Sequence, residues 1–196
     1  GQVVITQISG PVPGTYVPVN VVQSVTFKAQ DGAGNVSLCQ ASLKVKDAQS
    51  PKLVCPAGVQ DFDASANCNY IGTIPLNASA TDNCTLANVK NNLNNTNSVV
   101  GFVFPLGNTV VVWTATDVYG NTATCSYTVQ ITDHSAPIIS ICPPNRVIQM
   151  SSNGTGDCTG LVPNLLAELV VADNCSSSAN WVKVQTPAAN SSVGTT

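Results

Sequence analysis

The residues of this sequence whose types and spacing most clearly indicate a specific chemistry are its eight cysteines. They recur in similar local contexts, with Cys-Pro at 55–56 and 142–143 and Asp-Asn-Cys at 82–84 and 173–175. An even number of cysteines in repeated contexts is typical of a disulfide framework. Because disulfides persist in oxidising compartments, we expect the chain to be extracellular, either secreted or at the cell surface.

Catalytic chemistry has few candidate residues in this chain. The single histidine, His134, falls in an expected linker, and Glu168 is the only glutamate. Acid–base catalysis requires groups that converge in a pocket, and aspartates such as Asp61 and Asp63 lie on an expected polar loop. We therefore expect no catalytic residues and no enzyme activity.

Metal binding is the second chemistry to weigh. Six aspartates fall in expected loops or linkers, where oxygen ligands suit calcium: Asp31, Asp47, Asp82, Asp117, Asp133 and Asp173. Aspartate also stabilises turns by accepting hydrogen bonds from nearby backbone, and the turn from Asp117 to Gly120-Asn121 fits that role. Zinc is disfavoured because the cysteines lack short paired spacings and neighbouring histidines. We favour the turn role, with no metal or cofactor, and keep calcium as the alternative.

Composition limits the partners. Only 9% of the residues are charged, the net charge is −3, and the seven Lys and Arg residues are scattered. Nucleic-acid binding requires a clustered basic surface, so we expect no nucleic-acid partner. Membrane insertion is not expected either, because no apolar run approaches the roughly 18 residues of a membrane span.

Seven Asn-X-Ser/Thr sequons could carry glycans, which would keep a weakly charged surface soluble. We favour Asn77, Asn94, Asn153 and Asn190 as glycosylation sites over Asn35, Asn83 and Asn174. Two of the latter group, Asn83 and Asn174, stand beside cysteines that we expect to be bridged. A residue that carries a glycan must face solvent.

An internal repeat organises the elements that position these residues. Residues 25–56 and 109–143 share one pattern at a constant offset of 86, which aligns Phe27 with Trp113, Asp31 with Asp117, Gly34 with Gly120, Asn35 with Asn121, Cys39 with Cys125, Asp47 with Asp133 and Pro51 with Pro137. A period of this size indicates a domain-scale repeat rather than a solenoid. It divides the chain into the C-terminal part of one unit (1–47), a complete unit (48–133) and the N-terminal part of a third (134–196).

Alternation of apolar and polar residues predicts β-strands in each unit. In the first unit the residues expected to face a core are Val25, Phe27, Ala29, Cys39, Ala41, Leu43 and Val45. We expect the larger aromatic residues in cores rather than on a sugar-binding platform, namely Phe27, Trp113, Tyr127 and Trp181. Short strands separated by frequent turn signals predict an all-β fold of tandem immunoglobulin-like β-sandwiches.

The ordered motifs resemble the hyalin repeat (HYR) domain. The matching residues are Pro51, Cys55-Pro56, 80–84, 104–109, 114–117 with Gly120-Asn121, and 124–127. This resemblance implies an immunoglobulin-like β-sandwich that occurs in tandem in extracellular and cell-surface proteins and is linked to adhesion more than to catalysis. The incomplete first and third units, and an insertion before Asp173, depart from the family pattern.

Sandwiches of this type place their first and last strands side by side, so we expect Cys55 to pair with Cys125. We expect the other two cysteines of the complete unit, Cys68 and Cys84, to pair with each other. In the third unit Cys158 would pair with Cys175.

Cys39 and Cys142 are left over because each incomplete unit lacks the strand that would carry a partner. Pairing Cys39 with Cys55, and Cys125 with Cys142, is disfavoured: an extended strand and linker would separate the sulfurs far beyond the roughly 6 Å Cα distance of a disulfide. Two explanations stay open. The chain is a segment of a longer array, or residues 134–196 are completed by residues 1–47 of a neighbouring molecule, with Cys39 bonded to that neighbour's Cys142.

Head-to-tail completion does not close on itself and therefore yields fibres. We predict a structural subunit of an extracellular fibre or surface appendage, a head-to-tail homopolymer held by strand complementation and disulfides. One alternative is a spacer or ligand-binding segment of a large cell-surface adhesin, with calcium at the domain joints. The other is a non-catalytic appendage of a secreted enzyme.

Overall fold

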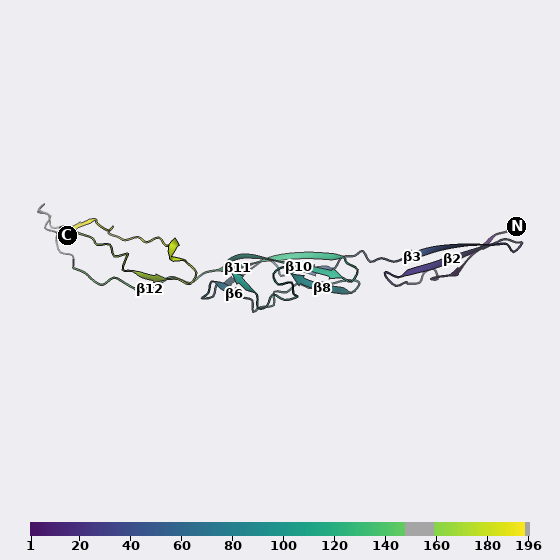
Figure 1. The fold of residues 1–196 in the computed structure, drawn as a ribbon, viewed down its shortest axis with the longest axis horizontal. Coiled ribbons are helices and arrows are strands. Elements are labelled where there is room, and N and C mark those ends of the chain that lie inside the picture. Colours follow the sequence, from purple (N-terminus) through teal and green to yellow (C-terminus); the bar gives the residue numbers. More distant parts are fainter. Residues whose placement is uncertain (148–158, 195–196) are drawn as a thin grey trace. The chain divides into compact units, whose positions relative to one another are not determined.

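The computed structural model describes residues 1–147 and 159–194, and in these residues the chain is all-β (Figure 1). Fifteen strands and one 3₁₀ helix, η1 (Ser178–Asn180), make up its regular structure there. The all-β, disulfide-linked fold predicted from the sequence is therefore confirmed. None of the helical structure in the described part of the chain has the length and hydrophobicity that crossing a bilayer requires.

By its internal contacts the chain forms two compact units, each assembled from separate segments. They are called unit 1 and unit 2 and are distinct from the repeat units of the sequence. Unit 1 contains Gly1–Pro56, Asn77–Ser98 and Val112–Ser126, and unit 2 contains Ala57–Leu76, Val99–Val111 and Tyr127–Thr196.

Unit 1 begins with an antiparallel sheet in the order β1 (Val4–Ser9), β2 (Val22–Gln30), β3 (Val36–Lys44). The β2–β3 hairpin has an unbroken register that places Phe27 opposite Cys39. A further antiparallel pair in this unit joins β4 (Lys52–Val54) to β7 (Ser79–Thr81).

A four-stranded sheet has the order β5 (Val59–Asp63), β11 (Thr122–Thr132), β10 (Gly107–Asp117), β8 (Leu86–Asn91). Strand β5 runs parallel to β11, and β8 runs antiparallel to β10. Three two-stranded pairs complete the described strands of unit 2: β6 (Asn69–Ile71) with β9 (Val103–Pro105), β12 (Ile138–Ile141) with β14 (Val170–Ala172), and β13 (Thr159–Leu161) with β15 (Ser192–Gly194).

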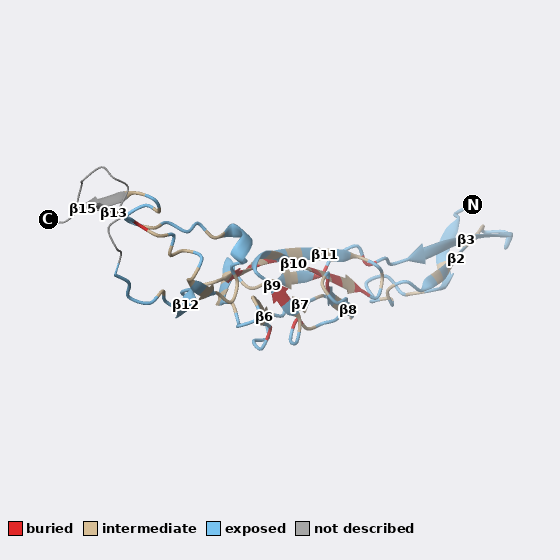
Figure 2. Ribbon diagram, turned by 60° about the vertical axis from the view of Figure 1, so that its left-hand side comes forward, coloured by how far each residue is buried: buried red, intermediate tan, exposed pale blue. Residues whose placement is uncertain are grey.

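The apolar alternation predicted for the second copy of the repeat is present in β10 and β11. Every second residue along the central part of each strand is buried, including Trp113 and Ala115 in unit 1 and Val129 and Ile131 in unit 2. Phe104 of β9 is fully buried as well, and the buried residues appear in red on β9, β10 and β11 in Figure 2. Trp113 and Tyr127 are therefore core residues, as expected.

The same alternation in the first copy does not produce a buried face. Every residue of β3 is exposed, including Cys39, Ala41 and Leu43, and Phe27 of β2 is 37% exposed (Figure 2). The inward orientation predicted for these side chains is therefore wrong for this structure. The physical reason is that the described residues provide no second layer against this side of β2 and β3.

Two disulfides occur among the described residues. Cys55 is bonded to Cys125 with a Cα–Cα distance of 5.9 Å, which is the pairing expected from the side-by-side position of first and last strands. This bond is incompatible with the disfavoured Cys39–Cys55 alternative.

The second disulfide differs from expectation, because it joins Cys68 to Cys175 rather than to Cys84. The Cys84 thiol instead lies beside the carboxylates of Asp47 and Asp82, as described below. Cys158, the partner predicted for Cys175, lies outside the described residues. Of the described cysteines, Cys39, Cys84 and Cys142 are free, and Cys39 and Cys142 are exposed.

Candidate functional site

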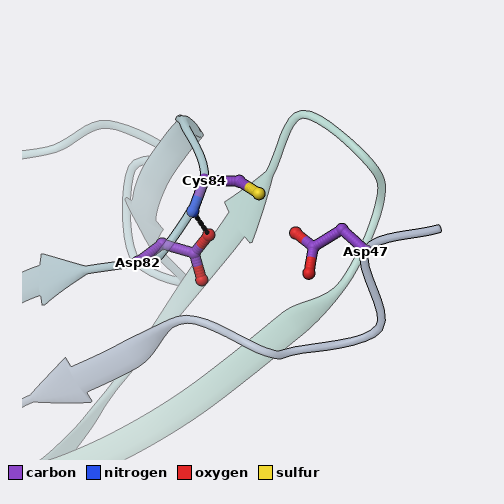
Figure 3. A group of neighbouring side chains, drawn as sticks. All are labelled: Asp47, Asp82 and Cys84. Carbon is purple, nitrogen blue, oxygen red and sulfur yellow. Dashed lines mark hydrogen bonds between the residues drawn. The ribbon is translucent and has the colours of Figure 1, made fainter. Parts of the chain in front are cut away.

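Three potential ligand side chains meet in unit 1. Asp47 lies in the linker between β3 and β4, while Asp82 and Cys84 lie in the loop between β7 and β8. One carboxylate oxygen of each aspartate and the Cys84 Sγ all lie within 4.8 Å of one another (Figure 3). We call these three residues the Asp-Asp-Cys cluster.

Both aspartates use one carboxylate oxygen to fix their own loop. Oδ2 of Asp82 accepts a hydrogen bond from the Cys84 backbone N–H at 2.8 Å, and Oδ1 of Asp47 accepts one from the Gln49 N–H at 3.1 Å. Aspartate side chains commonly stabilise turns in this way, by accepting a hydrogen bond from the backbone two residues later. The Asn121 side chain also donates to the backbone carbonyl of Asp47 at 3.4 Å, which links the Asp47 linker to the β10–β11 turn.

The second oxygen of each carboxylate is buried without a hydrogen-bond donor. These atoms are Oδ2 of Asp47 and Oδ1 of Asp82, and the Asp47 residue is only 6% exposed. Figure 3 shows the Asp47 carboxylate directed toward Cys84 and Asp82, with no hydrogen bond drawn between the thiol and Asp47. Burying a carboxylate oxygen without a partner is unfavourable, so the cluster has an unmet need for positive charge or a proton.

The same carboxylates act on the Cys84 thiol. Its pKa is raised, first because the Asp47 carboxylate can accept a hydrogen bond only from the protonated thiol, then because of burial and the negative charges of Asp47, Asp82 and Asp117. Cys84 is therefore poised as a neutral thiol as long as no cation is bound.

The other aspartates singled out from the sequence are engaged in separate turns. Oδ1 of Asp117 accepts hydrogen bonds from the N–H groups of Tyr119 and Asn121 at 2.8 Å, and Oδ2 accepts one from the Asn121 side chain at 2.7 Å. Asp31 forms the same three bonds with Ala33 and Asn35. Both aspartates thus have the turn role that the sequence favoured.

The hydrogen bonds of these turns change the acidity of their aspartates. Burial acts to raise the pKa of Asp117, but the bonds donated by the Asn121 side chain and by the turn backbone outweigh it and lower the pKa. At Asp31 the Asn35 side chain is the main cause of a lowered pKa. At Asp173 the N–H of Ser176 is the main cause of a similar decrease.

Among the remaining titratable candidates, Asp133 lines an open cavity together with Asp173 and Lys183, whereas His134, Asp61, Asp63 and Glu168 do not line that cavity. His134 Nδ1 lies 2.7 Å from Asp63 Oδ1, and both side chains are largely exposed. Asp61 accepts a hydrogen bond from the Thr132 hydroxyl at 3.2 Å, and Glu168 forms an ion pair with Arg146. Asp133 accepts a hydrogen bond from the Ser135 N–H at 3.0 Å.

The sequon asparagines are mostly at the surface. Asn77, Asn94 and Asn190 are exposed, and so are Asn35 and Asn83. Asn174 is partly buried and donates a hydrogen bond to the Ser65 carbonyl at 3.3 Å. Asn153 lies outside the described residues.

Of the aromatic candidates, Trp181 is half-buried, neither in a closed core nor on an open platform. It lines an open cavity together with Leu166, Leu169 and Val171.

Taken together, the fold and the disulfides define a class: a disulfide-linked all-β module from an oxidising, extracellular environment. Residues 46–131 of the chain match the family model of the HYR domain. The resemblance recognised from the sequence motifs is therefore confirmed, and with it the immunoglobulin-like character of the fold.

Two relatives align with most of the chain. It is 29% identical to Hyalin of Lytechinus variegatus over 147 residues, which cover 73% of this chain and 27% of the relative. It is 25% identical to Hyalin of Strongylocentrotus purpuratus over 159 residues, which cover 79% of this chain and 13% of the relative. The chain thus spans about a quarter or less of the length of these proteins.

Solved structures of cadherin ectodomains align with the chain at low similarity. The protocadherin gamma B4 extracellular domain aligns with 70% of this chain, and 27% of its own length, at 18% identity and a TM-score of 0.31. A protocadherin gamma B7 structure with extracellular cadherin domains 1–4 aligns with 80% of this chain, and 41% of its own length, at 14% identity and a TM-score of 0.32.

The sequence singled out Asp47, Asp82 and Cys84 separately but not as a cluster. It placed Cys84 in a disulfide and treated the aspartates as independent turn formers. The nearest signal was the Asp-Asn-Cys motif of the loop after β7, but the approach of Asp47 to this loop depends on the pairing of β4 with β7.

Proposed function

We propose that this protein is an adhesive structural subunit of an extracellular fibre or surface appendage, in which units of the HYR type assemble head to tail. The HYR family match and the disulfide framework support an adhesion-related role rather than a catalytic one. Its partners would be further copies of the same chain, with glycans on exposed sequons.

The observation that carries this proposal is the open apolar face of β2 and β3. Phe27 and Leu43 are 37% and 45% exposed, whereas their repeat equivalents Trp113 and Val129 are fully buried. A strand face with a core-like sequence gains stability only when another segment covers it, and an exposed patch of this kind is typical of an interaction surface.

Residues 134–196 supply a suitable covering segment. They contain the repeat equivalents of the strands that open the complete domain, and β12 carries the exposed apolar side chains of Ile138, Ile139 and Ile141. In the proposed assembly, this part of one molecule packs on β2 and β3 of the next. The domain boundaries at 47/48 and 133/134 are part of this proposal.

The free cysteines fit the same arrangement. Cys39 corresponds to Cys125 in the repeat, and the Cys142-Pro143 motif corresponds to Cys55-Pro56. In the complete domain these two positions form a disulfide, while Cys39 and Cys142 are both free and exposed. We therefore propose a disulfide between Cys39 of one molecule and Cys142 of its neighbour.

A second candidate is a spacer or ligand-binding segment within a large adhesin. The observation that favours it is that the hyalin relatives are several times longer than this chain. In that case the open face of β2 and β3 is covered by a preceding unit of the same polypeptide. A non-catalytic appendage of a secreted enzyme remains a third hypothesis, with no structural observation in its favour.

Two single variants, Cys39→Ser and Cys142→Ser, test the proposed assembly. On non-reducing gels the unmodified chain should form a ladder that collapses with reductant, and electron microscopy should show filaments. Each variant alone should stop the ladder. An equimolar mixture should give a disulfide-linked dimer and nothing longer, since only one complementary pair of thiols is left. A monomer under all conditions, or dimers of one variant alone, would contradict head-to-tail bonding.

A further inference from the structure

We propose that the Asp-Asp-Cys cluster of Asp47, Asp82 and Cys84 binds one divalent cation that accepts both oxygen and sulfur ligands, with Zn²⁺ as the representative ion. This site is independent of the proposed fibre assembly. It lies entirely within unit 1, in the linker after β3 and the loop after β7.

The spacing of the donor atoms suits such an ion. Zn²⁺ binds carboxylate oxygen at about 2.0–2.2 Å and thiolate sulfur at about 2.3 Å, so two of its ligands are at most roughly 4.5 Å apart. The three donor atoms lie within 4.8 Å of one another before any ion draws them together. Three protein ligands and one water would complete a tetrahedral site.

The unpartnered oxygens provide an independent indication of a ligand. Oδ2 of Asp47 and Oδ1 of Asp82 are buried and accept no hydrogen bond, and Asp47 is directed into the cluster (Figure 3). The ion pairs of the described residues, His134 with Asp63 and Arg146 with Glu168, lie elsewhere. A bound cation would compensate the buried Asp47 carboxylate and the inaccessible Oδ1 of the half-buried Asp82.

The sulfur atom selects the class of ion. Calcium takes six to eight oxygen ligands, whereas this cluster offers one carboxylate oxygen from each aspartate and one sulfur. Binding would replace the S–H bond of Cys84 with a metal–sulfur bond and release the proton to solvent. Asp117 does not serve as a ligand, because hydrogen bonds occupy both of its oxygens.

Neighbouring groups would orient the site. The Asn121 side-chain nitrogen donates a hydrogen bond to Asp117 Oδ2 at 2.7 Å, and it also donates one to the Asp47 backbone carbonyl at 3.4 Å. Such outer interactions typically fix the geometry of metal ligands. The bound ion would then fasten the linker after β3 to the loop after β7.

Titration calorimetry of the full chain tests this site. Zn²⁺ and Ca²⁺ are titrated in a background of Cys39→Ser and Cys142→Ser, which removes the two exposed thiols found in residues 1–147 and 159–194. We expect one Zn²⁺ per chain, and at least a tenfold weaker affinity in both Asp47→Asn and Cys84→Ser. Asp133→Asn is the matched control, because Asp133 is the repeat equivalent of Asp47 and lies outside the cluster. The affinity of this variant for Zn²⁺ should be unchanged.

Replacing Zn²⁺ with Co²⁺ gives a second readout. A sulfur-to-cobalt charge-transfer absorption should appear in the background protein and disappear in Cys84→Ser, whose folding is checked by Trp fluorescence. Three results would overturn the proposal: no saturable Zn²⁺ binding, Zn²⁺ binding that is unaffected by both ligand variants, or Ca²⁺ binding that persists in Cys84→Ser while Zn²⁺ does not bind. Finding Cys84 in a disulfide in the purified protein would overturn it as well.

Discussion

Removal of the Cys55–Cys125 disulfide should greatly destabilise the HYR domain. The bond joins the residue that follows β4 to β11, across a sequence separation of 70. Without it, the unfolded chain regains the conformational freedom of a long loop, while the folded state loses little contact area. The double variant Cys55→Ser/Cys125→Ser makes this change without leaving an unpaired thiol.

The expected loss follows from the length of the closed loop. The chain-entropy relation gives about 4 kcal/mol at room temperature for a loop of 70 residues. Small domains are typically stable by about 5–15 kcal/mol, so this loss is a large part of the total. Few other interactions in the domain could contribute as much individually.

Urea unfolding followed by the fluorescence of Trp113 measures the effect. Trp113 is fully buried in unit 1, and a Trp181→Phe background makes it the only tryptophan in the chain. The control is Cys39→Ser, which changes an exposed free cysteine and should alter the free energy of unfolding by less than about 0.5 kcal/mol.

Two results would refute the reasoning. One is a loss below about 1 kcal/mol in the double variant, because the loop-closure term would then be absent. The other is equal destabilisation by the Cys39 control, which would assign the effect to cysteine replacement as such.

Three further predictions concern packing and pH. Gly72→Ala should lower the free energy of unfolding by about 1–3 kcal/mol, because an added Cβ would lie 2.8 Å from a backbone carbonyl oxygen. Gly32→Ala is the control: its Cβ would meet open space, so the free energy of urea unfolding should hardly change. Trp113→Ala should lower the free energy of unfolding by about 3–5 kcal/mol, because Trp113 is fully buried. Phe27→Ala should lower the free energy of unfolding of the monomer far less, and its main effect should be shorter polymers in light scattering. The lowered pKa of Asp117 stabilises the fold above its unfolded pKa of about 3.9, and this contribution is lost as the pH falls through the lower folded pKa. Asp117→Asn should therefore flatten the fall of the urea midpoint between about pH 5 and pH 2; an unchanged pH profile would contradict this.

The parts of the structure set by local pattern were predictable. Trp113 and Tyr127 were expected in a core and are buried there, because a strand directs successive side chains to opposite faces. The turns at Asp31 and Asp117 were equally accessible, since an Asp with Gly-Asn three and four residues later contains all the groups that the turn requires.

Features that depend on distant segments were not predictable in the same way. The apolar face of β2 and β3 has a core-like sequence, but whether it is covered depends on what packs against it and not on its own pattern. The Asp-Asp-Cys cluster likewise requires the linker and the β7–β8 loop to meet, and no local motif specifies that contact.

The two Asp-Asn-Cys loops show how one motif can serve two purposes. In both loops the aspartate accepts a hydrogen bond from the cysteine N–H two residues later, at 2.8 Å for Asp82 and 3.0 Å for Asp173. The local turn is therefore the same, and it cannot decide the fate of the thiol. Cys175 has a cysteine partner and forms a disulfide, whereas Cys84 faces two carboxylates and stays free. Because a thiol bonded to sulfur is not available to a metal ion, the choice of partner for Cys68 determines whether the proposed cation site exists.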